Sequence, residues 1–331
     1  MTVALTGLTG FVGRHAAAAM LERGLSLRAL VRRGAASPHG GHSRLTPVVG
    51  DLDDHAALAA LCEGAEVVVH CAGLIAALDR DTYLRVNGEG TRNLVRAARR
   101  AGVRTFVHVS SLAAREPSLS PYAASKAAGE AAVNESAGDM RCVILRPPAV
   151  YGPGDRATLP LIASLRRPLI LLPGDPAGRL SLVHVGDLAR ALVVLATEDR
   201  VPPSVYEISD GRDGGYGLSE LGTIAARRSG RTPRVVMVPR RLLAWPAGIA
   251  EAVFRLRRRA GLFTPGKLAE IYHRDWVSRG PRLEDVSSWR PEIGFAEGFA
   301  ATVAWYEENG WLARPRSAAA VERNPRGSAL S

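Results

Sequence analysis

A tyrosine and a lysine four residues apart, Tyr122 and Lys126, are the residues of this sequence best suited to moving a proton. Residues at this spacing lie on the same face of a helix. An ammonium group beside a phenol favours the phenolate, so we expect Lys126 to lower the pKa of Tyr122 and to let it exchange a proton near neutral pH. Of the 43 basic residues only Lys126 and Lys267 are lysines. A lysine pKa responds to its surroundings, which suits a proton relay better than a guanidinium does.

A glycine-rich segment lies between a predicted strand and a predicted helix at the start of the chain. In that context the first glycine permits a tight turn, the second lets the backbone approach a pyrophosphate, and the third lets helix and strand pack closely. The amino-terminal end of the helix then faces the phosphates. We predict that the dinucleotide contacts here are Gly7, Gly10, Phe11, Val12 and Gly13.

The second predicted strand ends at Arg32 and Arg33. An acidic residue at this point would bind the ribose hydroxyls of NAD, whereas an arginine pairs with the 2′-phosphate of NADP. The sequence therefore favours NADP, with NAD as the other cofactor it would accept. The alternative is that both are surface residues of an arginine-rich protein.

Small and polar residues follow three further predicted strands. Asp51, with Leu52 after it, would meet the adenine amino group, or it would cap the next helix, as Asp53 or Asp54 equally would. A backbone without large side chains, at Ala72 and Gly73, would lie against the cofactor or form a plain turn. After the fifth strand, Ser110 and Ser111 would bind a substrate oxygen or form a cap; we favour the first interpretation because the Tyr–Lys pair follows.

Short apolar runs alternate with helical patterns through the first half of the chain, which predicts an α/β fold with a doubly wound parallel sheet. Ligands bind such sheets at the carboxyl ends of the strands. The predicted strands are Thr2–Thr6, Leu27–Val31, Pro47–Gly50, Glu66–Cys71, Thr105–Ser110 and Arg141–Leu145. The predicted helices are Arg14–Arg23, His55–Cys62, Tyr83–Ala101 and Tyr122–Asn134.

The second half predicts a smaller substrate-binding domain. We place the dinucleotide-binding domain at residues 1–151, with a returning segment at about 184–211 whose Val205–Ile208 would rejoin the main sheet. The substrate-binding domain takes residues 152–183 and 212–312, and residues 313–331 have the composition of a disordered tail. Within this half, Asp187 reads as the N-cap of a helix. Residues 242–259 form a helix over the substrate cleft or on an anionic membrane surface.

Composition narrows the partners and the compartment. The formal charge is +11, but the arginines are spread along the chain, which argues against a nucleic-acid-binding patch. No apolar run reaches transmembrane length and no signal peptide is evident, so we expect a cytoplasmic protein without stable membrane insertion. Three cysteines without a CxxC pair indicate no metal site. We interpret three histidines near strands as packed residues rather than ligands: His70, His108 and His184.

Taken together, these segments resemble the extended short-chain dehydrogenase/reductase superfamily of NAD(P)-dependent epimerases, dehydratases and reductases, which has a Rossmann domain. Beyond the glycine segment, the matching motifs are Gly50-Asp51-Leu52, Val86-Asn87-x-x-Gly90-Thr91, Val109-Ser110-Ser111, Tyr122-x-x-x-Lys126 and Arg146-Pro147-Pro148-x-Val150-Tyr151-Gly152. The resemblance implies that Tyr122 is the general acid/base, that Lys126 lowers its pKa and holds the nicotinamide ribose, and that Ser111 orients the substrate oxygen. It also implies cofactor contacts at Pro148 and a place for Asn87 near the crevice.

The segment between Ser111 and Tyr122 is shorter than in many members that act on nucleotide sugars. Later segments, such as Thr264-Pro265 and Asp275-Trp276, look more like dihydroflavonol reductases and 3β-hydroxysteroid dehydrogenases, which handle less polar alcohols and ketones. We therefore predict an NADP-preferring oxidoreductase acting on a small molecule. Two alternatives stay open: a nucleotide-sugar epimerase or dehydratase that recycles bound NAD, and a cofactor-binding scaffold or assembly factor without turnover. The oligomeric state is open too, a homodimer included.

Overall fold

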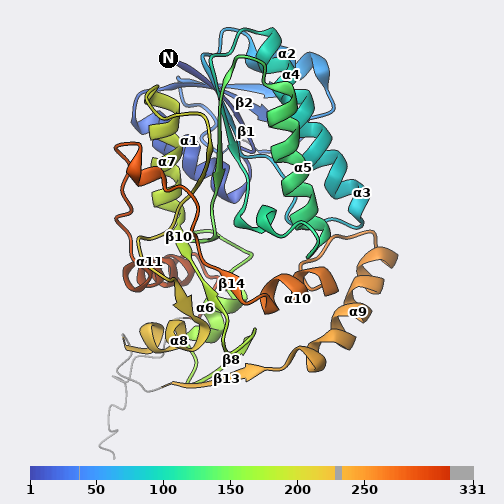
Figure 1. The fold of residues 1–331 in the computed structure, drawn as a ribbon, viewed down its shortest axis with the longest axis vertical. Coiled ribbons are helices and arrows are strands. Elements are labelled where there is room, and N and C mark those ends of the chain that lie inside the picture. The colour runs from blue at the N-terminus through green and yellow to red at the C-terminus, as the bar shows by residue number, and fades with distance from the viewer. Residues whose placement is uncertain (37, 228–232, 314–331) are drawn as a thin grey trace, which may run out of the picture.

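A seven-stranded parallel sheet organises the first half of the chain (Figure 1). The computed structural model describes residues 1–36, 38–227 and 233–313. The strand order is β11-β6-β5-β4-β1-β2-β3, so the order reverses beside β1 and the sheet is doubly wound, which confirms the predicted fold class. The strands are β1 (Thr2–Thr6), β2 (Ser26–Val31), β3 (Leu45–Val49), β4 (Val67–His70), β5 (Thr105–Val109), β6 (Arg141–Arg146) and β11 (Val205–Glu207).

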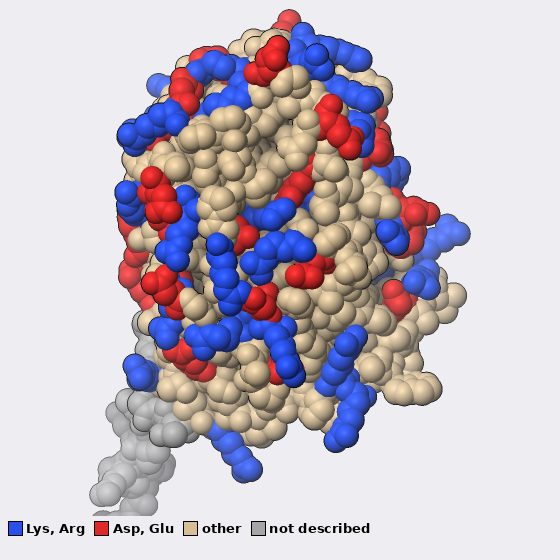
Figure 2. All heavy atoms as spheres, in the orientation of Figure 1, with Lys and Arg blue, Asp and Glu red and all other residues tan. Residues whose placement is uncertain are grey.

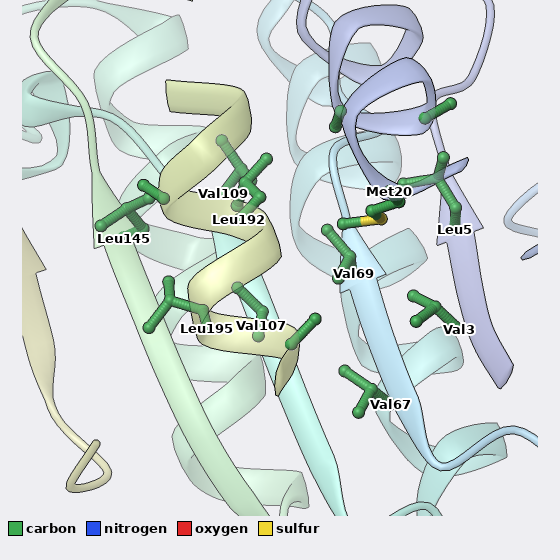
Figure 3. Close-up of a cluster of buried hydrophobic side chains, with 14 of the residues drawn as sticks. Val3, Leu5, Met20, Val67, Val69, Val107, Val109, Leu145, Leu192 and Leu195 are labelled. Carbon is green, nitrogen blue, oxygen red and sulfur yellow. The ribbon is translucent and has the colours of Figure 1, made fainter. Parts of the chain in front are cut away.

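Helices cover both faces of this sheet because its strands are apolar on both sides. One face packs against α1 (Phe11–Glu22) and α7 (Val185–Thr197), and the other against α2 (His55–Cys62), α4 (Gly90–Arg100) and α5 (Pro121–Ser136). Side chains along β1 alternate between these two helical layers: Val3 and Leu5 face the layer of α1 and α7, and Ala4 faces the layer of α2, α4 and α5. Figure 3 shows part of the first layer, where side chains of β1, β4, β5 and β6 meet those of α1 and α7.

The helical segment between β4 and β5 is longer and less regular than predicted. In place of one helix over Tyr83–Ala101, the chain forms α3 (Arg80–Tyr83), a π-helical turn η1 (Leu84–Glu89) and then α4. A π-helical turn inside a helix is uncommon and occurs frequently at functional sites. Here it carries Asn87, one of the motif residues.

The second half forms a smaller lobe below the sheet in Figure 1. Its core gathers aromatic and aliphatic side chains such as Tyr151, Phe295 and Tyr306. The strands are β7 (Ala149–Tyr151) with β10 (Leu182–His184), β8 (Leu169–Pro173) with β13 (Arg234–Val238), and β9 (Arg179–Leu180) between β12 (Tyr216–Gly217) and β14 (Asp275–Trp276). The helices are α6 (Leu159–Leu165), α8 (Leu218–Arg227), α9 (Arg240–Leu256), α10 (Pro265–Tyr272) and α11 (Phe295–Glu308), with the 3₁₀ turns η2 (Leu112–Arg115) and η3 (Leu283–Asp285).

The predicted return of the chain to the main sheet is present, because β11 pairs in parallel with β6. The residue bounds given for two domains stay a prediction. All but residue 313 of the predicted disordered tail lies outside the described residues.

Asp187 does not cap α7 as predicted. The N-cap is His184, whose Nδ1 accepts a hydrogen bond from Gly186 N at 3.1 Å. Asp187 is fully buried in the first turn, where its carboxylate accepts from the backbone N–H groups of Glu292 and Ile293 at 3.2 and 3.0 Å and pairs with Arg190. The carboxylate therefore ties α7 to the segment that leads into α11.

A buried hydrogen-bonded chain runs across the carboxyl ends of β1 and β4. Thr91 donates to the carbonyl of Asn87 at 2.7 Å, so its hydroxyl oxygen is left to accept from His70 Nε2 at 2.9 Å. His70 Nδ1 must then accept from the Thr6 hydroxyl at 2.7 Å, and Thr6 in turn accepts from Ala72 N at 3.2 Å. These partners fix one neutral tautomer, and burial lowers the pKa of His70 to about 3.

We predict that acid destabilises this part of the fold. His108 stacks on His70 at 5.2 Å between ring centroids, and burial lowers its pKa well below the usual value. In the unfolded chain both rings bind a proton near pH 6.5, so the unfolded state binds more protons and stability falls as the pH drops below that value. Between pH 7 and 5 each ring should cost about 2 kcal/mol of unfolding free energy.

Urea unfolding of His108→Leu at the two pH values measures one of these contributions. The pH-dependent loss should shrink by about 2 kcal/mol relative to wild type. His55→Gln, at an exposed histidine of α2, is the matched control and should leave the loss unchanged. An equal acid sensitivity in wild type and His108→Leu would contradict the prediction.

Candidate active site

The glycine segment forms a backbone cradle between β1 and α1. Gly7 has a φ of +80°, and a Cβ there would lie 2.7 Å from Ala72 N. A Cβ on Gly13 would lie 2.0 Å from the carbonyl oxygen of Gly7, so the turn and the helix can meet this closely only at glycine. The N-cap residue Gly10 brings no side chain to the first turn of α1. The N–H groups that begin at Phe11 and Val12 are therefore left for an anion, and the cradle fits a dinucleotide pyrophosphate.

Tyr122 lies in the first turn of α5, whose start is well defined by its sequence. Ser120 is the N-cap and accepts from Ala123 N at 3.0 Å, and Pro121 takes the first helical position. Burial raises the pKa of the Tyr122 phenol to about 12, and hydrogen bonding with the Ser111 side chain lowers it in part. The structure thus brings together the tyrosine and the serine that the sequence paired.

Lys126 lies one turn further along α5 and is buried. Its Nζ donates to the carbonyl oxygen of Val109 at 2.8 Å, at the end of β5. Burial lowers the pKa of Lys126 to about 8, against an opposing effect of Glu130. In the protein alone, the expected lowering of the Tyr122 pKa by Lys126 is not found: burial is the largest effect on the phenol, and the Lys126 ammonium is directed to the backbone.

The second lysine of the chain also reaches Tyr122, from the smaller lobe. Lys267, on α10, holds its Nζ 4.9 Å from the centroid of the Tyr122 ring. Glu270 fixes this ammonium at 2.6 Å and accepts from the Ser120 hydroxyl, also at 2.6 Å, so α10 is tied to the start of α5. Tyr83 packs edge-on against the same ring, with centroids 6.3 Å apart. Sequence reasoning missed the contacts of Lys267 and Tyr83 with Tyr122, although the scarcity of lysine was a signal for the first.

Asn87 links the loop after β4 to α5. Its Oδ1 accepts from Leu74 N at 2.7 Å, and its Nδ2 donates to Leu74 O at 3.0 Å and to Ser125 Oγ at 2.8 Å. Ser125 in turn donates to the carbonyl of Tyr122 at 2.7 Å. Both amide hydrogens are used, so Asn87 positions the backbone around Tyr122 rather than offering a free donor.

The two serines after β5 have separate surroundings. Ser110 is buried and donates to Glu130, which also binds the Arg146 guanidinium through both carboxylate oxygens. Ser111 faces the Tyr122 hydroxyl and accepts from Ala113 N at 3.2 Å as the N-cap of η2. Of the predicted pair, only Ser111 therefore lies beside the Tyr122 hydroxyl.

The remaining predicted cofactor residues lie at the carboxyl ends of neighbouring strands. Exposed Arg32 and Arg33 follow β2, and within the described residues neither side chain has a hydrogen-bond or ion-pair partner. Among the described residues, the Asp51 carboxylate accepts only from Asp53 N, at 2.9 Å, since the cap of α2 is Asp54. The others flank the same edge of the sheet: Leu52 after β3, Ala72 and Gly73 after β4, and Pro148 after β6.

One edge of the parallel sheet therefore carries an anion cradle, a phenol with the Lys267 ammonium over its ring and Lys126 one helical turn away, and a serine hydroxyl. This set can hold a dinucleotide and transfer a proton at an adjacent oxygen. In the described ranges no cluster of three His, Cys, Asp or Glu side chains has the arrangement of a metal site.

The model of the NAD dependent epimerase/dehydratase family matches residues 3–209, which is more than half of the chain. The chain belongs to this family. The match covers the glycine cradle, Ser111, Tyr122 and Lys126, which are thus all parts of the family's shared region. The family is NAD-dependent, and relatives within it carry names of reductases and dehydrogenases. The chain is accordingly an oxidoreductase of the short-chain dehydrogenase/reductase type.

The similarity of this family member to individual proteins extends beyond residues 3–209. A protein of Caulobacter vibrioides named ceramide reductase is 42% identical over 312 residues, which cover 94% of this chain and 96% of the relative. A ketoreductase of Stigmatella aurantiaca, named for 4-hydroxy-2-methyl-3-oxo-4-farnesyl-3,4-dihydroquinoline-1-oxide, is 29% identical over 77% of this chain and 81% of its own. Among solved structures, MoeE5 in complex with UDP-glucose and NAD superimposes with a TM-score of 0.72 at 24% identity, over 93% of this chain and 99% of that one, which shows the shared fold.

Proposed function

We propose that this protein reduces a ketone of a long-chain, ceramide-type lipid, with NADPH as the hydride donor. The observation that supports the substrate class most directly is the 42% identity to a ceramide reductase over 94% of the chain. A nicotinamide hydride reduces a ketone but not an amide, so the reacting carbon would be a ketone on the lipid backbone. The farnesyl group in the name of the Stigmatella relative is a second apolar chain on a ketoreductase substrate.

In this proposal Tyr122 donates its phenolic proton to the ketone oxygen, and the oxygen becomes the product hydroxyl. Bound NADPH would supply the hydride to the carbonyl carbon. Ser111, next to the phenol, would hold the ketone oxygen, and the Lys267 ammonium over the Tyr122 ring would stabilise the phenolate that remains. The glycine cradle would hold the pyrophosphate, and Lys126 would hold the nicotinamide ribose.

NADPH oxidation with a long-chain N-acyl amino ketone tests the proposal, followed by mass spectrometry of the product. We expect a product heavier by two hydrogens, with one NADPH consumed for each product formed. Tightly bound NAD that survives purification, with turnover of a UDP-sugar and no net reduction, would replace the proposal with the epimerase alternative. Stable cofactor binding without turnover of any carbonyl compound would favour a scaffold.

The preference for NADPH depends on the exposed arginines after β2. We predict that Arg32→Asp weakens NADPH binding about 10- to 100-fold, because one charge-assisted hydrogen bond to a phosphate contributes about 1.5–3 kcal/mol. NADH binding should not weaken, since it has no 2′-phosphate. Isothermal titration calorimetry with both cofactors measures the two affinities. Arg23→Gln, which removes an exposed arginine at the far end of α1, is the control and should bind both cofactors as wild type does. If wild type binds NADH more tightly than NADPH, the predicted preference for NADPH is wrong.

A further inference from the structure

Helix α9 carries a stripe of large apolar side chains that point into solvent. Leu242, Trp245, Ile249, Val253 and Leu256 are exposed by 61, 82, 62, 38 and 85%. At 3.6 residues per turn these positions fall within an arc of about 80°. We call this set the α9 stripe. Apolar residues scattered singly on a surface need no explanation, but five in a row along one helix indicate a binding face.

The α9 stripe is not the face by which the helix packs on the protein. The only buried residue of α9 is Ala247, and the half-buried Leu243 and Phe254 lie on the same side as Ala247. That side lies more than about 100° around the helix from the centre of the stripe. The sequence left two interpretations, a cover for the substrate cleft and a membrane contact. In the structure, α10 lies next to Tyr122, and the α9 stripe is exposed to solvent.

Arginines accompany the stripe at both ends of the helix. Arg240 and Arg241 begin α9, and Arg257, Arg258 and Arg259 follow its last turn, all exposed. Figure 2 shows the surface at the lower right, where Figure 1 places α9, as largely uncharged, with blue side chains toward its upper end. An apolar face bounded by cations complements the interface of a bilayer that contains anionic lipids.

The α9 stripe also lies near the candidate active site. α9 packs against α10, which places Lys267 over the Tyr122 ring. The pKa of Asp79 is lowered mainly by hydrogen bonds from Thr82 and further by the Arg255 charge, so the carboxyl-terminal end of α9 lies near the loop that follows β4. Ile75 in that loop and Phe263 between α9 and α10 are further exposed apolar side chains.

We propose that the α9 stripe docks on the surface of an anionic phospholipid bilayer. No helix in the described parts of the chain is long and apolar enough to cross a membrane, so the contact would lie in the interface plane. In a protein bound in this way α9 would lie on the lipid, and its neighbour α10 reaches Tyr122 through Lys267. The proposal concerns binding alone and does not depend on the proposed reaction.

Vesicle binding of the full-length protein, without cofactor or substrate, tests the proposal. Trp245 is a reporter within the stripe, and its fluorescence should shift to the blue with vesicles of phosphatidylcholine and phosphatidylglycerol. Sedimentation with these vesicles should exceed that with phosphatidylcholine alone and should weaken as salt rises. The triple variant Leu242→Ser/Ile249→Ser/Leu256→Ser should bind about tenfold less or weaker still.

Two further measurements make the result specific. Trp245→Phe should lose most of the fluorescence shift but keep sedimentation, and Arg257→Gln/Arg258→Gln/Arg259→Gln should weaken binding to the anionic vesicles only. Undiminished sedimentation of the triple serine variant would overturn the proposal. A wild-type dimer that the triple serine variant converts to a monomer, without vesicle binding by either, would also overturn it and assign the stripe to contact between copies of the chain. If the wild-type protein binds vesicles but does not reduce the ketone, the proposed function is refuted and the membrane proposal stands.

Discussion

Replacing Tyr122 with phenylalanine is expected to lower the turnover number for ketone reduction about 10²–10⁴-fold, the range for loss of a positioned proton donor. The substitution removes only the hydroxyl that faces Ser111, while the ring contacts with Tyr83 and Lys267 remain. Cofactor binding should therefore stay close to wild type. Steady-state kinetics together with calorimetry of NADPH binding separate the two effects.

Ser110→Ala is the contrasting variant for this experiment. Ser110 is committed to Glu130 and does not face the phenol, so its loss should reduce stability more than it reduces turnover. Ser111→Ala, by contrast, should lower turnover far more than Ser110→Ala does, although loss of the η2 cap should also cost about 1 kcal/mol of unfolding free energy. Turnover of Tyr122→Phe within threefold of wild type would remove the phenol from the reaction.

The sequence was sufficient for those parts of the fold that follow from local pattern. Strand β1 and helix α2 have the predicted bounds, and the serine before Pro121 marks the start of α5. The glycine spacing was equally informative, because Gly13 must approach the Gly7 carbonyl within the same turn, where a Cβ would lie 2.0 Å from the oxygen. Signals of this kind are local, so a sequence displays them without knowledge of the tertiary fold.

The contacts that the sequence did not predict come from distant parts of the chain. Lys267 and Glu270 reach Tyr122 and Ser120 only because the smaller lobe folds back on the sheet. The π-helical turn has no pattern that separates it from a regular helix. The raised pKa of Tyr122 arises from burial, which depends on every element packed around it and is not encoded in the four-residue spacing to Lys126.

Replacing Lys126 with arginine is expected to lower the rate of reduction about 10²-fold even though the charge is kept. Lys126 is buried, its Nζ donates to Val109 O at 2.8 Å, and a Cβ on Gly73 would lie 3.8 Å from that nitrogen. The larger, planar guanidinium cannot occupy this space without moving the ends of β4 and β5, and a displacement of about 1 Å at a reacting centre can cost about 10²-fold. Kinetics at pH 7 measure the effect.

Lys267→Arg is the matched control, because it makes the same exchange at the only other lysine. The Lys267 side chain is 28% exposed, and an arginine there can still pair with Glu270 and lie over the Tyr122 ring. It should cost no more than about fivefold in the rate of reduction.

The pH profile gives a second readout of Lys126. Because its pKa is lowered to about 8, Lys126 loses its charge as the pH rises through that value, while the phenol, with a pKa of about 12, keeps its proton. Reduction by wild type should thus fall above about pH 8, and Lys126→Met should be slow at every pH without that fall. Equal losses in the two arginine variants would show that the buried site has no special need for lysine.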